Sequence, residues 1–356
     1  STDTIGHGTA MASVAAGSRL SGNRRFVGAA PDCNIVVVKL KPIKQYLREY
    51  YLIPEDVPCY QETDLIQAIQ YLQKFAVSLY SPLVICLGVG TNLGAHSGVS
   101  VFARYLDLVM GRKSRAAVTC AGNEGNAAHH YHGELTRQQP SQNVEIRVGG
   151  EFTFIFERTR IIVEYLLVEQ NSGAELVRFR MERPTPGIWT ISVRTEVDVV
   201  NGSFDMWLPI TQFLESEVIF LEPTPYTTIT EPGYVHRSIT ATAYNDANRS
   251  FYANSGRGYA RDGYVKPDIA APGVNVSTIM GSMTGTSMAA AITAGGVAQI
   301  MQWAVVDGNN VLADSFTMRN YLIRGAIREA GMSYPNREWG YGRLNIEGVF
   351  RFLAGS

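Results

Sequence analysis

The stretch Gly285-Thr286-Ser287-Met288 opens a run of small residues, Ala289-Ala-Ala-Ile-Thr-Ala-Gly-Gly296, that continues without proline to Trp303. Apart from its two glycines the run lacks helix breakers, so it predicts a helix. The small side chains would let this helix lie close to neighbouring backbone and would fix Ser287 at its buried N-terminus. A serine there is either an N-cap or a nucleophile whose developing oxyanion the helix dipole and free amides favour. The rest of the chain has to decide between the two.

Size and composition exclude several classes of protein. With 356 residues the chain exceeds the roughly 250–300 residues at which single cores stop growing, so two domains are expected. A formal net charge of -1 gives no reason to expect nucleic acid as a partner. We also expect no membrane-spanning helix and no membrane as a partner, because no apolar run approaches about 18 residues free of charge. The cysteines have no metal-ligand spacing and are predicted to be free thiols, not disulfides: Cys33, Cys59, Cys86 and Cys120.

Helices and strands alternate over residues 1–132. The glycines around His7 open a small-residue helix that closes at Gly17. The predicted strands are 32–40, 83–87 and 116–120, the predicted helices are 63–77 and 99–110, and 41–60 is a predicted loop. This alternation predicts a parallel sheet wound with right-handed crossovers.

The pattern changes between residues 133 and 235, where short runs alternate apolar and polar residues. The predicted strands are 143–148, 151–158, 161–169, 175–182, 188–197, 204–208 and 217–221. They predict an antiparallel β-sandwich or jelly roll. From residue 236 the first pattern returns, with strands at 238–243 and 266–273 and a helix at 316–330. We therefore expect an α/β core made of 1–132 and 236–356, with residues 133–235 inserted.

Three motifs together resemble the subtilisin-like serine proteases, or subtilases. They are Gly6-His7-Gly8-Thr9, Ala121-Gly122-Asn123-Glu124-Gly125-Asn126 and Gly285-Thr286-Ser287-Met288-Ala289, in the family's order of His, oxyanion-Asn and Ser boxes. Lys266–Gly273 and Trp339–Asn345 resemble accessory motifs of the same family. The resemblance implies a subtilisin-like parallel sheet flanked by helices and a serine endopeptidase.

The resemblance also implies the roles of individual residues. His7 would be the general base, Ser287 the nucleophile and the side-chain amide of Asn123 an oxyanion donor, which agrees with the chemistry these groups can perform. Without the other motifs Asn123 would be read as a turn residue. Substrate would add as a strand along the cleft edges formed by Cys86, Leu87, Gly88, Ala121 and Gly122.

The third member of the triad has no place in this chain. Subtilases carry their catalytic Asp on an early strand upstream of the His box, and Asp3 lies only four residues before His7, at what the resemblance makes a loop position. The chain starts without Met or a signal peptide, which indicates a cut end. We therefore expect the N-terminal part of the fold to be missing, with an N-terminal fragment or prodomain of the same precursor supplying the Asp. A truncated record is the alternative.

Departures from common subtilases narrow the resemblance. Ala291 and Ile292 stand where a Pro and a His are usual, and Ala10 replaces a second His of the His box. The stretches 285–295, 90–96 and 122–130, together with the predicted jelly-roll insertion, resemble the Csp germination proteases of clostridia. That resemblance implies limited proteolysis of the pro-form of a spore cortex hydrolase, and a location in the bacterial spore. The alternatives are a catalytically silent pseudoprotease that acts in signalling, or a general secreted, extracellular subtilase.

Two further patterns resemble a cofactor loop and a metal site, but neither has the required spacing, so we expect no cofactor and no metal. Leu87–Gly94 resembles a dinucleotide loop, but its third glycine is displaced and Asp107 falls inside a predicted helix. His129-His130-Tyr131-His132 has no carboxylate or cysteine at useful spacing, so it is predicted to be a packed junction loop, not a metal site.

Overall fold

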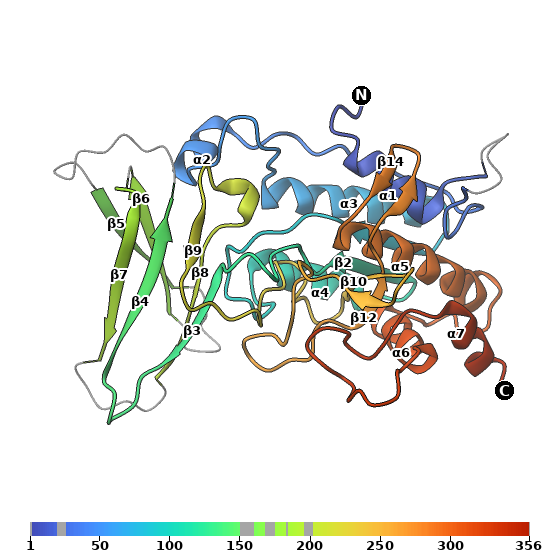
Figure 1. The fold of residues 1–356 in the computed structure, drawn as a ribbon. Helices are drawn as coiled ribbons and strands as arrows, with labels where there is room; N and C mark the ends of the chain where they lie inside the picture. Colours follow the sequence, from blue (N-terminus) through green and yellow to red (C-terminus); the bar gives the residue numbers. More distant parts are fainter. Residues whose placement is uncertain are drawn as a thin grey trace.

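The computed structural model describes residues 2–19, 26–149, 160–167, 175–182, 184–195 and 202–355. Its helices are α1 (His7–Ala16), α2 (Gln45–Tyr50), α3 (Glu62–Ser78), α4 (Val101–Met110), the 3-10 helix η2 (Thr211–Phe213), α5 (Thr286–Met301) with its π-helical continuation η3 (Gln302–Val306), α6 (Ser315–Gly325) and α7 (Ile346–Leu353). A helix-and-sheet core carries both ends of the chain, and a β-rich region stands beside it (Figure 1).

The core contains a parallel sheet, as the alternating pattern predicts. β1 (Leu83–Leu87) pairs with β2 (Arg115–Cys120), β2 with β10 (Ile239–Asn245), and β10 with β12 (Ile269–Pro272), all in parallel. The short β11 (Ser250–Phe251) is antiparallel to β10. A separate hairpin of β13 (Val276–Thr278) and β14 (Gly281–Met283) precedes α5. Because β2 and β10 are neighbours, everything between them in the sequence leaves the sheet and returns to it.

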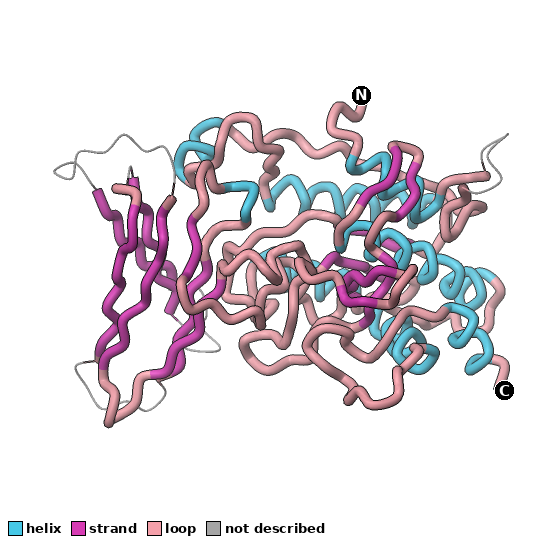
Figure 2. The backbone as a smooth tube through the Cα atoms, viewed as in Figure 1, coloured by secondary structure: helices cyan, strands magenta, loops and turns pink. Residues whose placement is uncertain are grey.

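Helices cover both faces of this sheet, so the core has three layers (Figure 2). Alternate residues of a strand point to opposite faces, and β2 shows this directly. Ala116 and Val118 pack with α5, α6 and α7, while Ala117 packs with α3 and α4. The all-buried β2 is what a strand covered on both faces requires.

The small residues of α5 permit a close helix contact, as predicted. A Cβ added to Gly295 would lie 2.5 Å from the carbonyl oxygen of Ala15, at the end of α1, and 2.5 Å from the Cβ of Ala29. The segment Thr286–Val306 is also long and apolar enough to cross a membrane, and 61% of its most apolar stretch is buried. The sequence prediction of no such helix is therefore wrong on length and composition. Packing against the sheet accounts for the apolar residues here.

The β-rich region, defined here as β3 to β9, is built from antiparallel ladders. β4 (Ser141–Val148) pairs with β7 (Gly187–Arg194) and β9 (Val218–Phe220), β3 (His130–Glu134) with β8 (Ser203–Trp207), and β5 (Arg160–Leu167) with β6 (Glu175–Glu182). Its core holds Tyr131, Val144, Ile146, Val148 and Phe220. The predicted strand 151–158 lies outside the described residues, and the assignment to a jelly roll stays a prediction.

Three local predictions are wrong. Residues 34–40 form no strand, although their sequence is β-branched, because no described strand lies beside them to accept a ladder. The predicted loop 41–60 contains α2. The predicted junction loop at His130 is strand β3, whose partner β8 lies some seventy residues further along the chain.

Candidate active site

Ser287 lies in the first turn of α5, but it is not the cap of that helix. The N-cap is Gly285, which has no side chain with which to cap the helix. Ser287 is 8% exposed, and its hydroxyl donates to the carbonyl oxygen of Gly88 at 3.5 Å. Its backbone amide belongs to the first helical turn, where amides lack intrahelical acceptors. The geometry therefore removes the capping role and leaves a hydroxyl aimed across the end of β1.

His7 is the first residue of α1, and its ring also lies beside Gly88. The His7 Cε1 lies 3.3 Å from the position a Cβ would occupy on Gly88, so the ring and the Ser287 hydroxyl meet at this glycine. No residue that the structure describes hydrogen-bonds the ring. Burial lowers the pKa of His7, and the nearby Asp3 carboxylate opposes that shift. The imidazole is thus held neutral, as a base must be before it accepts a proton.

The Asp3 carboxylate makes hydrogen bonds to the start of α1 and none to the His7 imidazole. Its Oδ1 accepts from the amides of Ile5 and Gly6, and its Oδ2 accepts from the amide and the hydroxyl of Thr9, at 2.6–3.1 Å. These bonds, led by that from the Thr9 hydroxyl, hold the pKa of Asp3 below its usual range. Both oxygens are therefore engaged in capping α1.

Asn123 follows β2 and is fixed by the nucleophile helix. Its Oδ1 accepts from the Thr286 amide at 3.1 Å and from the Thr286 hydroxyl at 3.2 Å. The carbonyl end of the amide is thus committed, and Nδ2 donates to no described residue. Because Asn123 is bonded to the helix turn that carries Ser287, its Nδ2 can stabilise an oxyanion that forms beside the serine.

The predicted substrate-contacting residues lie on two neighbouring strand ends. Cys86 and Leu87 end β1, Gly88 follows them, and Gly122 follows β2; all four line the cavity that also contains His7 and Ser287. Ala121 is fully buried, and its carbonyl accepts from the Thr230 amide. The role of these residues in binding stays a prediction.

The four cysteines are free thiols, as predicted. Burial raises the pKa of Cys86 to about 12 and also raises that of Cys120. Both thiols therefore stay protonated at neutral pH and are poor nucleophiles there.

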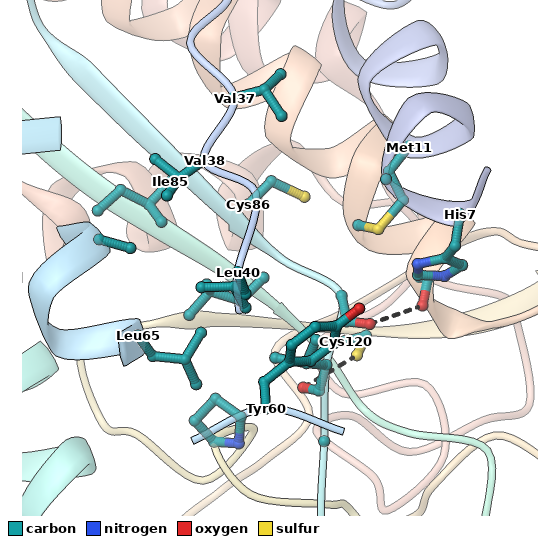
Figure 3. Close-up of a pocket in the computed structure, with 18 of the residues that line it drawn as sticks. His7, Met11, Val37, Val38, Leu40, Tyr60, Leu65, Ile85, Cys86 and Cys120 are labelled. Carbon is teal, nitrogen blue, oxygen red and sulfur yellow. Dashed lines mark hydrogen bonds between the residues drawn. The ribbon is translucent and has the colours of Figure 1, made fainter. Parts of the chain in front are cut away.

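The cavity continues from the site along the open edge of β1. It has a volume of about 2330 Å³ and lies between β1 and the extended segment 34–40. Figure 3 shows Val37, Val38 and Leu40 passing Ile85 and Cys86, with His7 at the side of the view away from Leu65. Among the described strands β1 pairs only with β2. One edge of the sheet therefore borders an apolar slot that leads to the His7 ring.

Sequence reasoning missed two residues of the site. Thr230 is 2% exposed, and its hydroxyl has no partner among the described residues. It fills the space between Gly90 and Gly122, because a Cβ on either glycine would lie within 2.4 Å of its Oγ1. Glu124, next to Asn123, bonds to the β-rich region. Both arrangements depend on contacts distant in sequence, and no local signal marks them.

The histidine cluster is a polar junction between the two parts of the molecule. His130 Nε2 and His132 Nδ1 lie 3.0 and 2.8 Å from the Asp205 carboxylate, which also accepts from Arg261 Nε at 3.0 Å. No group of three or more His, Cys, Asp or Glu residues with metal-site geometry occurs in the described ranges. The cluster joins β3 to β8 and to the core.

Comparison with known proteins agrees with this geometry. The subtilase family model of peptidase S8 matches residues 216–342, which include Ser287. The structure of the Clostridium perfringens CspB protease superimposes with a TM-score of 0.85 at 26% identity, covering 100% of this chain and 82% of that one. Sphericase gives 0.54 at 15% identity (97% and 78% covered), and the prenylagaramide maturation protease PagA gives 0.53 at 15% (98% and 82%), which shows a shared fold alone. No curated protein matches the sequence.

Proposed function

Because the chain is a subtilisin-like, peptidase S8-type serine protease, we propose that it hydrolyses peptide bonds through an acyl-enzyme on Ser287. The observation that carries this is the meeting of the Ser287 hydroxyl and the His7 ring at Gly88. A serine hydroxyl is a weak nucleophile until a neighbouring base takes its proton. In support of these roles, His7 and Ser287 reach this one glycine from α1 and α5, which lie far apart in sequence.

The reaction follows from these positions. His7 accepts the Ser287 proton as Oγ attacks the substrate carbonyl, and the carbonyl oxygen becomes an oxyanion. The Ser287 amide and Asn123 Nδ2 donate to that oxygen. The imidazolium then gives its proton to the leaving amine, and water, deprotonated by His7, cleaves the ester. Every proton that leaves the serine or the water passes through the His7 ring.

We propose that the slot beside β1 receives a strand from an N-terminal fragment of the same precursor. An unpaired strand edge accepts another strand readily. Ile35 and Val37, across the slot, are 51% and 68% exposed, which an added apolar strand would reduce. A carboxylate at the end of that strand would reach the His7 ring and supply the third member of the triad. Without it, turnover should fall by about 10⁴-fold, a magnitude established for serine proteases.

We propose further that the cleavage is limited and activates the pro-form of a spore cortex hydrolase during germination, in the bacterial spore. The similarity to the CspB protease over the whole chain supports this. The β-rich region, which we assign to a jelly roll, also supports it: residues 210–213 line the same cavity as Ser287. Such a wall restricts access, which disfavours a general secreted subtilase.

The other candidate is a pseudoprotease that acts in signalling. The specific observation in its favour is that no described residue hydrogen-bonds the His7 ring. The protease requires an added carboxylate that bonds the His7 ring, whereas the pseudoprotease does not.

Labelling with a fluorophosphonate tests the proposal, because the probe reacts only with an activated serine. We expect labelling of this chain together with its N-terminal fragment, much slower labelling of the chain alone, and none in Ser287→Ala. An absence of labelling in both wild-type samples would establish the pseudoprotease instead.

A further inference from the structure

The turn that follows β2 is held from two opposite sides. Asn123 bonds to Thr286 in the nucleophile helix. Glu124, the next residue, turns toward the β-rich region and bonds to Thr211. Consecutive residues thus connect the oxyanion turn to α5 on one side and to η2 on the other.

The Glu124 carboxylate is buried and fully used by its partners. It is 7% exposed. Its Oε2 accepts from His129 Nδ1 at 2.7 Å and from the Thr211 amide and hydroxyl at 3.1 Å, and its Oε1 lies 3.2 Å from the same amide. A buried carboxylate is costly unless such donors surround it, and hydrogen bonds to an ionised acceptor are stronger than neutral ones. This set of bonds is therefore a strong local connection.

The partner of Glu124 lies on a wall of the active-site cavity. Ile210, Thr211, Gln212 and Phe213 line the same cavity as His7 and Ser287. Thr211 and Gln212 are exposed and Phe213 is only half-buried. Ile210 is buried and anchors the start of the turn, but apolar burial contributes little to holding residues 211–213 after it. The bonds to Glu124 are the polar contacts that fix it against the core.

The approach to the turn is fixed at one more point. The Leu208 carbonyl accepts from Asn92 Nδ2 at 3.0 Å, and the Leu208 amide donates to the His129 carbonyl at 3.0 Å. Beyond Leu208 the chain reaches the cavity with Glu124 as its next polar anchor. Loss of Glu124 should consequently free residues 211–213, while Ile210 stays buried and β8 stays docked.

We propose that Glu124 is a positioning residue that holds residues 210–213 as a wall of the substrate cleft. Through it the β-rich region selects substrates: a peptide must fit between this wall and the Ser287 end of the cleft. The inference rests on the proposed protease function. It makes Glu124 a determinant of peptide binding and not of the attack by Ser287.

The test uses the chain in complex with its N-terminal fragment and compares Glu124→Gln with wild type. Glutamine keeps the shape and one acceptor but removes the charge and the bond to His129. We expect KM for an extended peptide to rise about 10-fold, while the rate of Ser287 labelling by a small fluorophosphonate changes less than 2-fold. Thr211→Val should reproduce part of the effect, and adding it to Glu124→Gln should have less than an additive effect. Glu145→Gln, which changes an exposed carboxylate on β4 outside the cavity lining, is the matched control and should leave KM within 2-fold.

Hydrogen exchange of the Thr211 amide gives a readout that needs no activity. That amide donates to Glu124, so its exchange should accelerate at least 10-fold in Glu124→Gln, with β8 amides unchanged. If wild type hydrolyses no peptide, the proposed protease function fails. The exchange result still decides whether Glu124 holds the turn at Thr211 in place. Equal losses in peptide hydrolysis and in labelling, or unchanged exchange at Thr211, would overturn the inference.

Discussion

The hydroxyl of Ser287 donates to the carbonyl oxygen of Gly88 at 3.5 Å, and the His7 ring lies against the same glycine. This contact is long for an O–H donor, so the hydroxyl is weakly held and free to turn toward the imidazole. The three residues that we propose as nucleophile, base and oxyanion donor therefore lie close together in one cavity. What it lacks among the described residues is a partner that orients the imidazole.

The first prediction concerns the pH dependence of Ser287 labelling. Burial lowers the pKa of His7, with Asp3 opposing, and only the neutral ring can act as base. Labelling of the chain alone should rise with pH and reach its half-point below 6.5. A carboxylate beside the ring stabilises the imidazolium, so adding the N-terminal fragment should move the half-point upward. A half-point at or above 6.5 in the chain alone would contradict this.

Asn123→Ala tests the oxyanion donor. The change removes Nδ2, and also the Oδ1 contact with Thr286, so kcat of the complex should fall by about 10²–10³, a magnitude established for an oxyanion-hole asparagine in subtilisin. KM should change little, because the donor acts on charge that develops in the transition state. Steady-state kinetics on a peptide substrate measures both values, and an unchanged kcat would remove Asn123 from the site.

Asp205 should make the junction with the β-rich region acid-sensitive. Burial alone would raise its pKa, but hydrogen bonds from His130 and His132 outweigh burial and lower it to about 2. A depressed carboxylate pKa stabilises the fold above pH 4, and that contribution is lost as pH falls from about 4 to about 2. It amounts to about 2 kcal/mol.

The measurement is the free energy of unfolding in denaturant at pH 5 and at pH 2.5. Wild type should lose more stability between the two than Asp205→Asn, which has no proton to gain at this position. Equal losses in the two proteins would show that the Asp205 contacts contribute nothing at pH 5.

Gly295→Ala tests the close packing of α5 on α1. Its new methyl group would lie 2.5 Å from the Ala15 carbonyl oxygen, so backbone has to move, at a cost of about 1–3 kcal/mol. Gly149→Ala is the control, because its methyl would meet its nearest neighbour at 3.4 Å, an ordinary contact. Thermal unfolding should separate the two variants, and equal melting temperatures would argue against tight helix contact.

The sequence could predict the parts of the fold that depend on local pattern. The fully buried β2, with its apolar centre Ala116–Val118, and the small-residue α5 are examples, since burial on all sides leaves a direct mark on composition. The β-branched sequence within residues 32–40 led to the wrong prediction of a strand, because a strand also needs a neighbour to pair with. Strand β3 was missed because its partner β8 lies some seventy residues further along the chain.

The candidate site divides in the same way. His7, Asn123 and Ser287 stand in short motifs whose spacing is local, so they could be found in the sequence. The contacts of Thr230 with Gly90 and Gly122, and of Glu124 with Thr211, join distant segments and needed the structure. Both sets meet in one cavity.

The most direct test of the account is the rate of Ser287 labelling by a fluorophosphonate in the chain alone, with the N-terminal fragment, and with a fragment whose strand Asp is changed to Asn. We predict that the intact fragment accelerates labelling by several orders of magnitude and that the Asn variant binds without doing so. Equal rates in all three samples, with the fragment bound, would contradict the completion of this site by an added carboxylate strand.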